Sequence, residues 1–161
     1  TDVTGVQTCA LPILNKVLGI DPGSEHVGFG QQSPEGHLFG EIKLSREGAW
    51  RDIEAKIDWA DLVVVEEYRP REFLQGDGPK TAETIGRIKE ICQRLGKRVE
   101  MVNHVTWRTW AGNLVATMAM VGADRDGAIA LHFGEDWALI DGHGHDGGLI
   151  ALWGEAEAGD E

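Results

Sequence analysis

The chain has 161 residues, which allows one domain with a substantial core and excludes two enzyme domains of kinase or ATPase type. Hydrophobic residues make up 42% and charged residues 26%, a composition typical of globular proteins, and no apolar run is long enough to predict a membrane span. The formal net charge of −12 disfavours a polyanionic partner such as nucleic acid, unless the bases are concentrated in one region.

Residues 1–13, TDVTGVQTCALPI, lack the basic start and the small-residue cleavage site of a secretory signal. They resemble the in-frame translation of a sequencing-library adapter, and we predict that they form an artefactual or disordered leader. Without Cys9, Cys92 is the one cysteine of the domain, so no disulfide can form within it. This favours a reducing, cytoplasmic setting.

Three strands are predicted at the start of the domain. Residues 16–21 form a short apolar run that ends in the turn sequence Pro-Gly, as a buried strand does. Residues 26–31 and 37–43 are two further strand candidates, separated by SPEG, a turn sequence of hairpin length. The pattern predicts three antiparallel strands.

A helix and a buried strand are predicted next. Apolar residues at helical spacing predict a helix with Ser45 as its N-cap that ends at about Trp59. Residues 62–65 are a β-branched run that is too short for a helix and apolar on both faces, which favours an internal parallel strand. This strand ends in two carboxylates, Glu66 and Glu67.

The rest of the chain continues the alternation of helices and strands. A helix is predicted over residues 82–95 and a fifth strand over residues 98–103. Residues 106–120 show no clear pattern, whereas residues 124–133 and 144–153 are predicted to be helical. A single domain over residues 14–154 follows, with an acidic tail at residues 155–161.

Four polar residues follow predicted elements that are far apart in the sequence. Asp21 ends the first strand, Glu66 follows the fourth, and His143 and Asp146 lie at the start of the last helix. Adjacent strand ends are neighbours in a sheet, so three carboxylates and an imidazole can converge there. Clustered carboxylates raise each other's pKa, and a divalent cation such as Mg²⁺ or Mn²⁺ relieves the repulsion. The chemistry implied is metal-assisted phosphodiester hydrolysis with two ions about 3.5–4 Å apart.

Each of these residues also has a simpler interpretation. Asp21 precedes Pro-Gly and is compatible with an ordinary turn, and Glu66 with a solvated acid at a strand end. The histidines of DGHGHD, His143 and His145, are compatible with an exposed loop, and Asp146 with a helix N-cap.

Several separated motifs, in order, resemble the RuvC family of Holliday-junction resolvases. KVLGIDPGS at residues 16–24 resembles the family's first strand, and VVVEE at residues 63–67 is similar to its fourth strand, which carries a catalytic Glu. TWR at residues 106–108 and ADR at residues 123–125 look like the segments that approach DNA, and HGHD at residues 143–146 is similar to the closing motif. The resemblance implies an α/β, ribonuclease-H-like fold: a mixed five-stranded sheet, three strands antiparallel and then parallel strands, flanked by helices. Periodicity alone leaves other α/β arrangements open.

The resemblance also implies roles for individual residues. Asp21, Glu66 and Asp146 become ligands of two Mg²⁺ or Mn²⁺ ions, and His143 becomes a fourth ligand or an orienter of the attacking water. Glu67 competes with Glu66, because adjacent strand residues point to opposite faces and only one can face the site. No organic cofactor and no membrane are expected.

DNA contacts are expected from the basic part of the chain. Residues 69–108 contain nine bases and five acids, so one face can be positive despite the acidic total. The resemblance makes Arg108 and Arg125 phosphate contacts, because a guanidinium binds phosphate bidentately. Tyr68 or Phe73 is a candidate for stacking on an unpaired base, although a role in capping the core is at least as compatible with either residue. Arg69 is a further candidate for DNA binding.

Two other features of the sequence bear on the site. Gly147-Gly148 follows Asp146 where the family usually has Ala and an aliphatic residue, which weakens a helix by up to about 1 kcal/mol per Gly and suggests a less rigidly held ligand. Trp107 and Trp110 are more often core residues than base-stacking ones.

The carboxylate cluster predicts a metal-dependent nuclease, and the resemblance implies that it cuts four-way DNA junctions in recombination and repair. A homodimer is then expected, because two symmetric nicks need two related active sites. Two alternatives stay open. One is an RNA-directed nuclease of the same superfamily, and the other is a catalytically impaired module that binds branched DNA.

Overall fold

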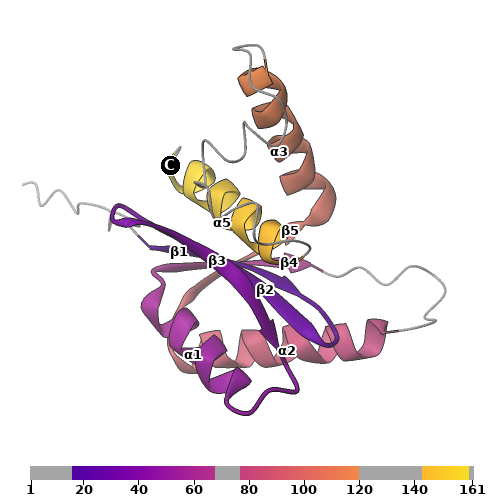
Figure 1. Ribbon diagram of the computed structural model, residues 1–161. Helices are drawn as coiled ribbons and strands as arrows, with labels where there is room; N and C mark the ends of the chain where they lie inside the picture. Colours follow the sequence, from indigo (N-terminus) through magenta and orange to yellow (C-terminus); the bar gives the residue numbers. More distant parts are fainter. Residues whose placement is uncertain (1–15, 68–76, 120–142, 160–161) are drawn as a thin grey trace, which may run out of the picture.

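The computed structural model describes residues 16–67, 77–119 and 143–159, and its centre is one mixed sheet of five strands (Figure 1). The strand order is β3-β2-β1-β4-β5. β1, β2 and β3 are antiparallel, whereas β4 and β5 run parallel to β1. The predicted fold class is therefore confirmed. The strands are β1 (Val17–Pro22), β2 (His26–Ser33), β3 (Gly36–Lys43), β4 (Leu62–Glu67) and β5 (Arg98–Asn103).

Helices cover both faces of this sheet (Figure 1). α1 (Ala49–Trp59) and α2 (Gly78–Arg94) lie on one face, and α3 (His104–Ala119) and α5 (His143–Gly159) lie on the other. β4 shows why two layers form, since Val63 and Val65 pack toward α1 and α2 while Val64 packs toward α3 and α5. All three valines are fully buried, as expected for an internal parallel strand. None of the helices that the structure describes is both long enough and apolar enough to cross a lipid bilayer.

Several elements differ in extent from the sequence-based prediction, most of them by a few residues at one end. α1 begins at Ala49 rather than after Ser45, because turns precede it and Gly48 adopts a left-handed conformation (φ 78°) at the N-cap. The region after β5, for which no pattern was assigned, forms α3. α5 continues past Trp153 to Gly159, so the start of the predicted acidic tail is helical. The helix predicted over residues 124–133 and the leader lie outside the described residues.

The first half of α5 lies in direct backbone contact with β1 and β2, and glycines on both elements allow this approach. A Cβ atom added to Gly19 would lie 2.2 Å from the amide nitrogen of Ala151, and one on Gly30 would lie 2.4 Å from Cα of Gly148. On the helix side, a Cβ on Gly147 would lie 2.6 Å from the backbone of Phe29. Gly147-Gly148 is therefore a packing contact with β2, a role that helix propensity alone does not indicate.

Candidate active site

Two carboxylates reach the same face of the sheet because side chains alternate along a strand. Asp21 has the parity of Val17 in β1, and Glu66 has the parity of Val64 in β4, so both face the layer of α3 and α5. β1 and β4 are parallel neighbours, and both residues stand one position beyond the last paired residues of these strands. Glu67 has the opposite parity and faces the other layer. The alternation of side chains therefore identifies Glu66, rather than Glu67, as the glutamate that faces the site.

The first turn of α5 adds an imidazole and a third carboxylate to this end of the sheet. The ring Nδ1–H of His143 donates a hydrogen bond to the Asp21 carboxylate. Asp146 lies one turn further along the helix. A Cβ atom on Gly28 would lie 1.7 Å from the carbonyl oxygen of His143, so a glycine in β2 is required for this turn to lie where it does.

α3 contributes two consecutive residues to the same group of side chains. The indole Nε1–H of Trp107 donates a hydrogen bond to Oε2 of Glu66 over 3.1 Å. The guanidinium of Arg108 lies 3.4 Å from Oδ2 of Asp146, and its side chain is 58% exposed. The cluster of carboxylates therefore has a buried hydrogen-bond donor, Trp107, on one side and a solvent-accessible cation, Arg108, on the other.

Burial and mutual repulsion both act on the pKa values of the acids in this group. Burial, together with the negative charge of Asp21, raises the pKa of Glu66 to about 7, although the hydrogen bond from Trp107 opposes this. Burial and the charge of Asp21 also raise the pKa of Asp146 above its ordinary value. The hydrogen bond to Asp21 raises the pKa of His143. Burial is the larger cause of the raised pKa in both Glu66 and Asp146, and the charge of Asp21 adds to it.

The donor set fits a hard divalent cation. Carboxylates are the ligands that Mg²⁺ and Mn²⁺ prefer, and a cation among them would oppose the repulsion that, after burial, contributes to the raised pKa values of Glu66 and Asp146. In the part of the chain that the structure describes, no three His, Cys, Asp or Glu side chains already stand close enough to share one ion. Binding of a cation therefore requires the carboxylates to move toward each other.

Removing the charge of Glu66 is expected to stabilise the metal-free protein above neutral pH. The folded state holds the Glu66 proton up to about pH 7, whereas an unperturbed glutamate releases it near 4.5, so the stability that depends on this proton is lost as the pH rises between these values. Glu66→Gln cannot ionise, and we expect a Tm about 2–4 °C above that of the parent at pH 8 in EDTA. Thermal unfolding at pH 4 and pH 8 measures this effect, and an equal Tm difference at both pH values would contradict it.

Asp21, Glu66, His143 and Asp146 lie at one end of the sheet. His143 is hydrogen-bonded to Asp21, Arg108 lies 3.4 Å from Asp146, and the charges of Asp21 and Asp146 act on Glu66. Arg125, Tyr68, Arg69 and Phe73 lie outside the described residues. Trp107 is the functional candidate that the sequence analysis treated as core. It is 1% exposed, so the core assignment holds, but its N–H also serves Glu66. Its place directly before Arg108 in TWR was the one signal in the sequence.

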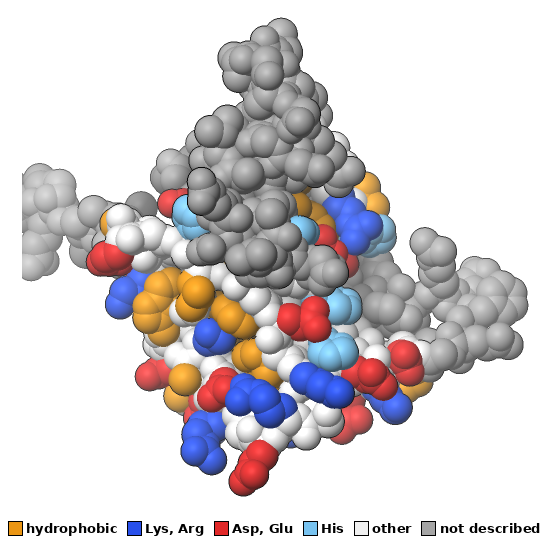
Figure 2. Space-filling view, in the orientation of Figure 1, with side chains coloured by type: hydrophobic (Ala, Val, Ile, Leu, Met, Phe, Trp, Pro, Cys, Tyr) orange, Lys and Arg blue, Asp and Glu red, His pale blue; other side chains and the backbone are white. Residues whose placement is uncertain are grey.

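The bases of residues 69–108 that the structure describes are partly neutralised by acids. Arg94 forms ion pairs with Glu54 and Glu90, and Lys97 lies 3.7 Å from Asp58. On the face seen in Figure 2, basic and acidic side chains are interspersed. The excess of bases over acids in residues 69–108 therefore does not by itself indicate a basic surface on α1 and α2. Among the described bases of this segment, Arg108 is the one that lies beside the carboxylates.

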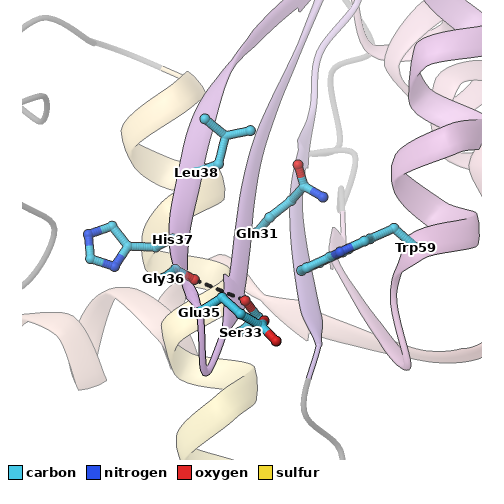
Figure 3. Close-up of a pocket in the computed structure, with 7 residues that line it drawn as sticks. All are labelled: Gln31, Ser33, Glu35, Gly36, His37, Leu38 and Trp59. Carbon is cyan, nitrogen blue, oxygen red and sulfur yellow. Dashed lines mark hydrogen bonds between the residues drawn. The ribbon is translucent and has the colours of Figure 1, made fainter.

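A shallow hollow of about 280 Å³ lies at the other end of β2 and β3 (Figure 3). Gln31 and Trp59 lie on one side of it, and the β2–β3 turn closes it with a hydrogen bond from Ser33 Oγ to the carbonyl oxygen of Gly36. The register pairs Asp21 with Gly28 and Val17 with Gln32, so the hollow and the carboxylates are at opposite ends of these strands. The hollow is separate from the candidate site.

Comparison with known proteins adds information about the fold. No protein-family model matches the chain, and no curated protein matches its sequence. The structure of Thermus thermophilus RuvC in complex with a Holliday-junction substrate is similar, with a TM-score of 0.62 and 20% identity over 86% of this chain and 90% of that chain. A second Thermus thermophilus RuvC structure gives 0.57 and 19% over 85% and 91%. The chain has the ribonuclease-H-like fold of RuvC.

Proposed function

We propose that the protein is a metal-dependent endonuclease that hydrolyses phosphodiester bonds in four-way DNA junctions. The observation that carries the proposal is the meeting of Asp21, Glu66 and Asp146 at one end of the sheet, with raised pKa values for two of them. The similarity in fold to RuvC, one of whose structures holds a Holliday-junction substrate, supports branched DNA as the substrate class.

Each residue of the site has a proposed task. Asp21, Glu66 and Asp146 hold two Mg²⁺ or Mn²⁺ ions, which when bound supply Lewis-acid activation of water and stabilise the leaving oxygen. The Nδ1–H of His143 is engaged with Asp21, which leaves Nε2 to orient the attacking water or to serve as a ligand. The exposed guanidinium of Arg108 binds the phosphate backbone next to the scissile bond.

The proposed substrate implies a homodimer. A four-way junction is two-fold symmetric, so two symmetric nicks need two active sites related by the same symmetry. Sedimentation of the protein with and without a junction tests the dimer separately from the chemistry.

A substrate panel tests the proposal directly. The parent protein is incubated with a labelled four-way DNA junction, a linear DNA duplex or an RNA duplex of matched length. The protein is in about 10-fold excess, so that each measurement is a single turnover, and the buffer contains Mg²⁺, Mn²⁺ or EDTA. We expect cleavage of the junction with either ion, none with EDTA, and much slower cleavage of both duplexes. Faster cleavage of the RNA duplex would replace the proposal with an RNA-directed nuclease, and junction binding without cleavage in either ion would replace it with a binding module.

A further inference from the structure

The side chain of Trp107 is buried in the apolar core and also contacts one of the site carboxylates. It is fully buried, in a cluster of apolar residues that includes Val64 and Ile150. Its Nε1–H nevertheless ends at a carboxylate, Oε2 of Glu66, 3.1 Å away. A buried indole N–H needs an acceptor, and Glu66 supplies it. The bond therefore links the apolar core beneath the sheet end to the group of acids above it.

The elements on either side fix the geometry of this bond. β4 and β5 are paired so that Glu66 stands opposite Val102. The next residue, Asn103, accepts a hydrogen bond from the N–H of Val105 over 2.8 Å, and this holds the start of α3 at the end of β5. Trp107 is thus placed by a cap and a strand register, and it reaches Glu66 from a rigid position.

We infer that Trp107 is a positioning residue for Glu66, and that its indole N–H keeps this carboxylate on the side of Asp21 and Asp146. Without the donor, Glu66 sits partly buried beside two other acids and is expected to turn toward solvent, away from them. With the donor, one carboxylate oxygen is anchored to the core. The inference deepens the proposed function and rests on it, because the consequence lies in ion binding by Glu66.

A substitution that keeps the aromatic ring and removes the donor isolates this role. Trp107→Phe retains much of the buried apolar surface and loses the N–H. Trp110→Phe is the matched control, because Trp110 lies in the same helix and packs at the edge of the same apolar cluster. Asp21→Asn serves as the variant without a working site.

Three measurements on the full chain separate positioning from folding. Mn²⁺ titration by calorimetry is expected to give an affinity about 10–100-fold lower for Trp107→Phe than for the parent, and an affinity within about twofold for Trp110→Phe. For Trp107→Phe, the maximal rate of single-turnover cleavage of a four-way junction is expected to fall by a similar factor. The protein concentration that gives half of the maximal rate is expected to be unchanged. In the metal-free protein, the indole N–H resonance that Trp107→Phe removes from the ¹H–¹⁵N spectrum is expected to be the one that Glu66→Gln shifts most.

The outcomes distinguish this inference from the proposed function. If the parent binds Mn²⁺ and cuts the junction, but Trp107→Phe equals Trp110→Phe in affinity and rate, the positioning role is wrong and the nuclease stands. If the parent neither binds Mn²⁺ nor cuts, both fall together. If Trp107→Phe does not fold, the shift of one indole resonance between the parent and Glu66→Gln decides, and the absence of any such shift overturns the inference.

Discussion

Replacing Asp21 with Asn is expected to slow cleavage of a four-way junction in Mg²⁺ by at least about 100-fold. Asp21 is 8% exposed, it is hydrogen-bonded to His143, and its charge is a cause of the raised pKa of both other acids. An asparagine has the same shape but lacks the charge that the cations need. The pKa values of Glu66 and Asp146 should fall toward their ordinary range in this variant, because the repulsion from residue 21 disappears.

Junction binding by Asp21→Asn should be equal to or tighter than that of the parent, because one negative charge is removed near Arg108. Gel mobility shift with EDTA measures binding, and single-turnover cleavage measures the rate. Asp52→Asn is the matched control, since Asp52 forms an ion pair with Arg46 at the exposed surface of α1, on the opposite layer. If Asp21→Asn cuts as fast as Asp52→Asn, the active site has been placed wrongly.

Replacing Gly147 with Ala is expected to destabilise the protein by about 1–3 kcal/mol, which lowers the Tm by about 2–10 °C. Helix propensity taken alone predicts the opposite, a gain of up to about 1 kcal/mol. The structure reverses the sign because the added Cβ would lie 2.6 Å from the backbone nitrogen and Cα of Phe29, atoms that cannot move without moving β2. Relief of this contact would displace the first turn of α5, so His143 and Asp146 should shift and cleavage should fall as well.

The control for this prediction is a glycine at which propensity alone applies. Gly86 lies inside α2, and a Cβ added there would meet no atom within 4 Å. Gly86→Ala should therefore raise stability by up to about 1 kcal/mol and leave cleavage unchanged. Urea unfolding of the parent and both variants measures the three free energies of unfolding. Stabilisation by Gly147→Ala of the same size as by Gly86→Ala would show that α5 does not contact β2 as closely as described.

The patterns that predicted the fold correctly are local ones. The β-branched residues of β4 indicate burial, and Pro22-Gly23 indicates the chain reversal that begins at the end of β1. The start of α1 was misplaced because Ser45 has the chemistry of an N-cap, whereas the turns before the helix and the left-handed backbone of Gly48 set its first residue. Local propensity therefore allows several start positions for this helix, and the conformation of the preceding residues determines which one forms.

Asp21, Glu66, His143 and Asp146 were named from the sequence because they end predicted strands or begin a predicted helix, and because their motifs resemble those of the RuvC family. The alternation of side chains in β4 then separated Glu66 from Glu67. The sequence alone did not predict the hydrogen bond from Trp107 to Glu66 or the close packing of Gly147 against β2. The indole N–H finds its acceptor 41 residues away, and the glycine faces a strand more than a hundred residues earlier. Contacts of this kind depend on strand register and on the distance between layers, which arise when the whole chain packs and are not encoded in any one segment.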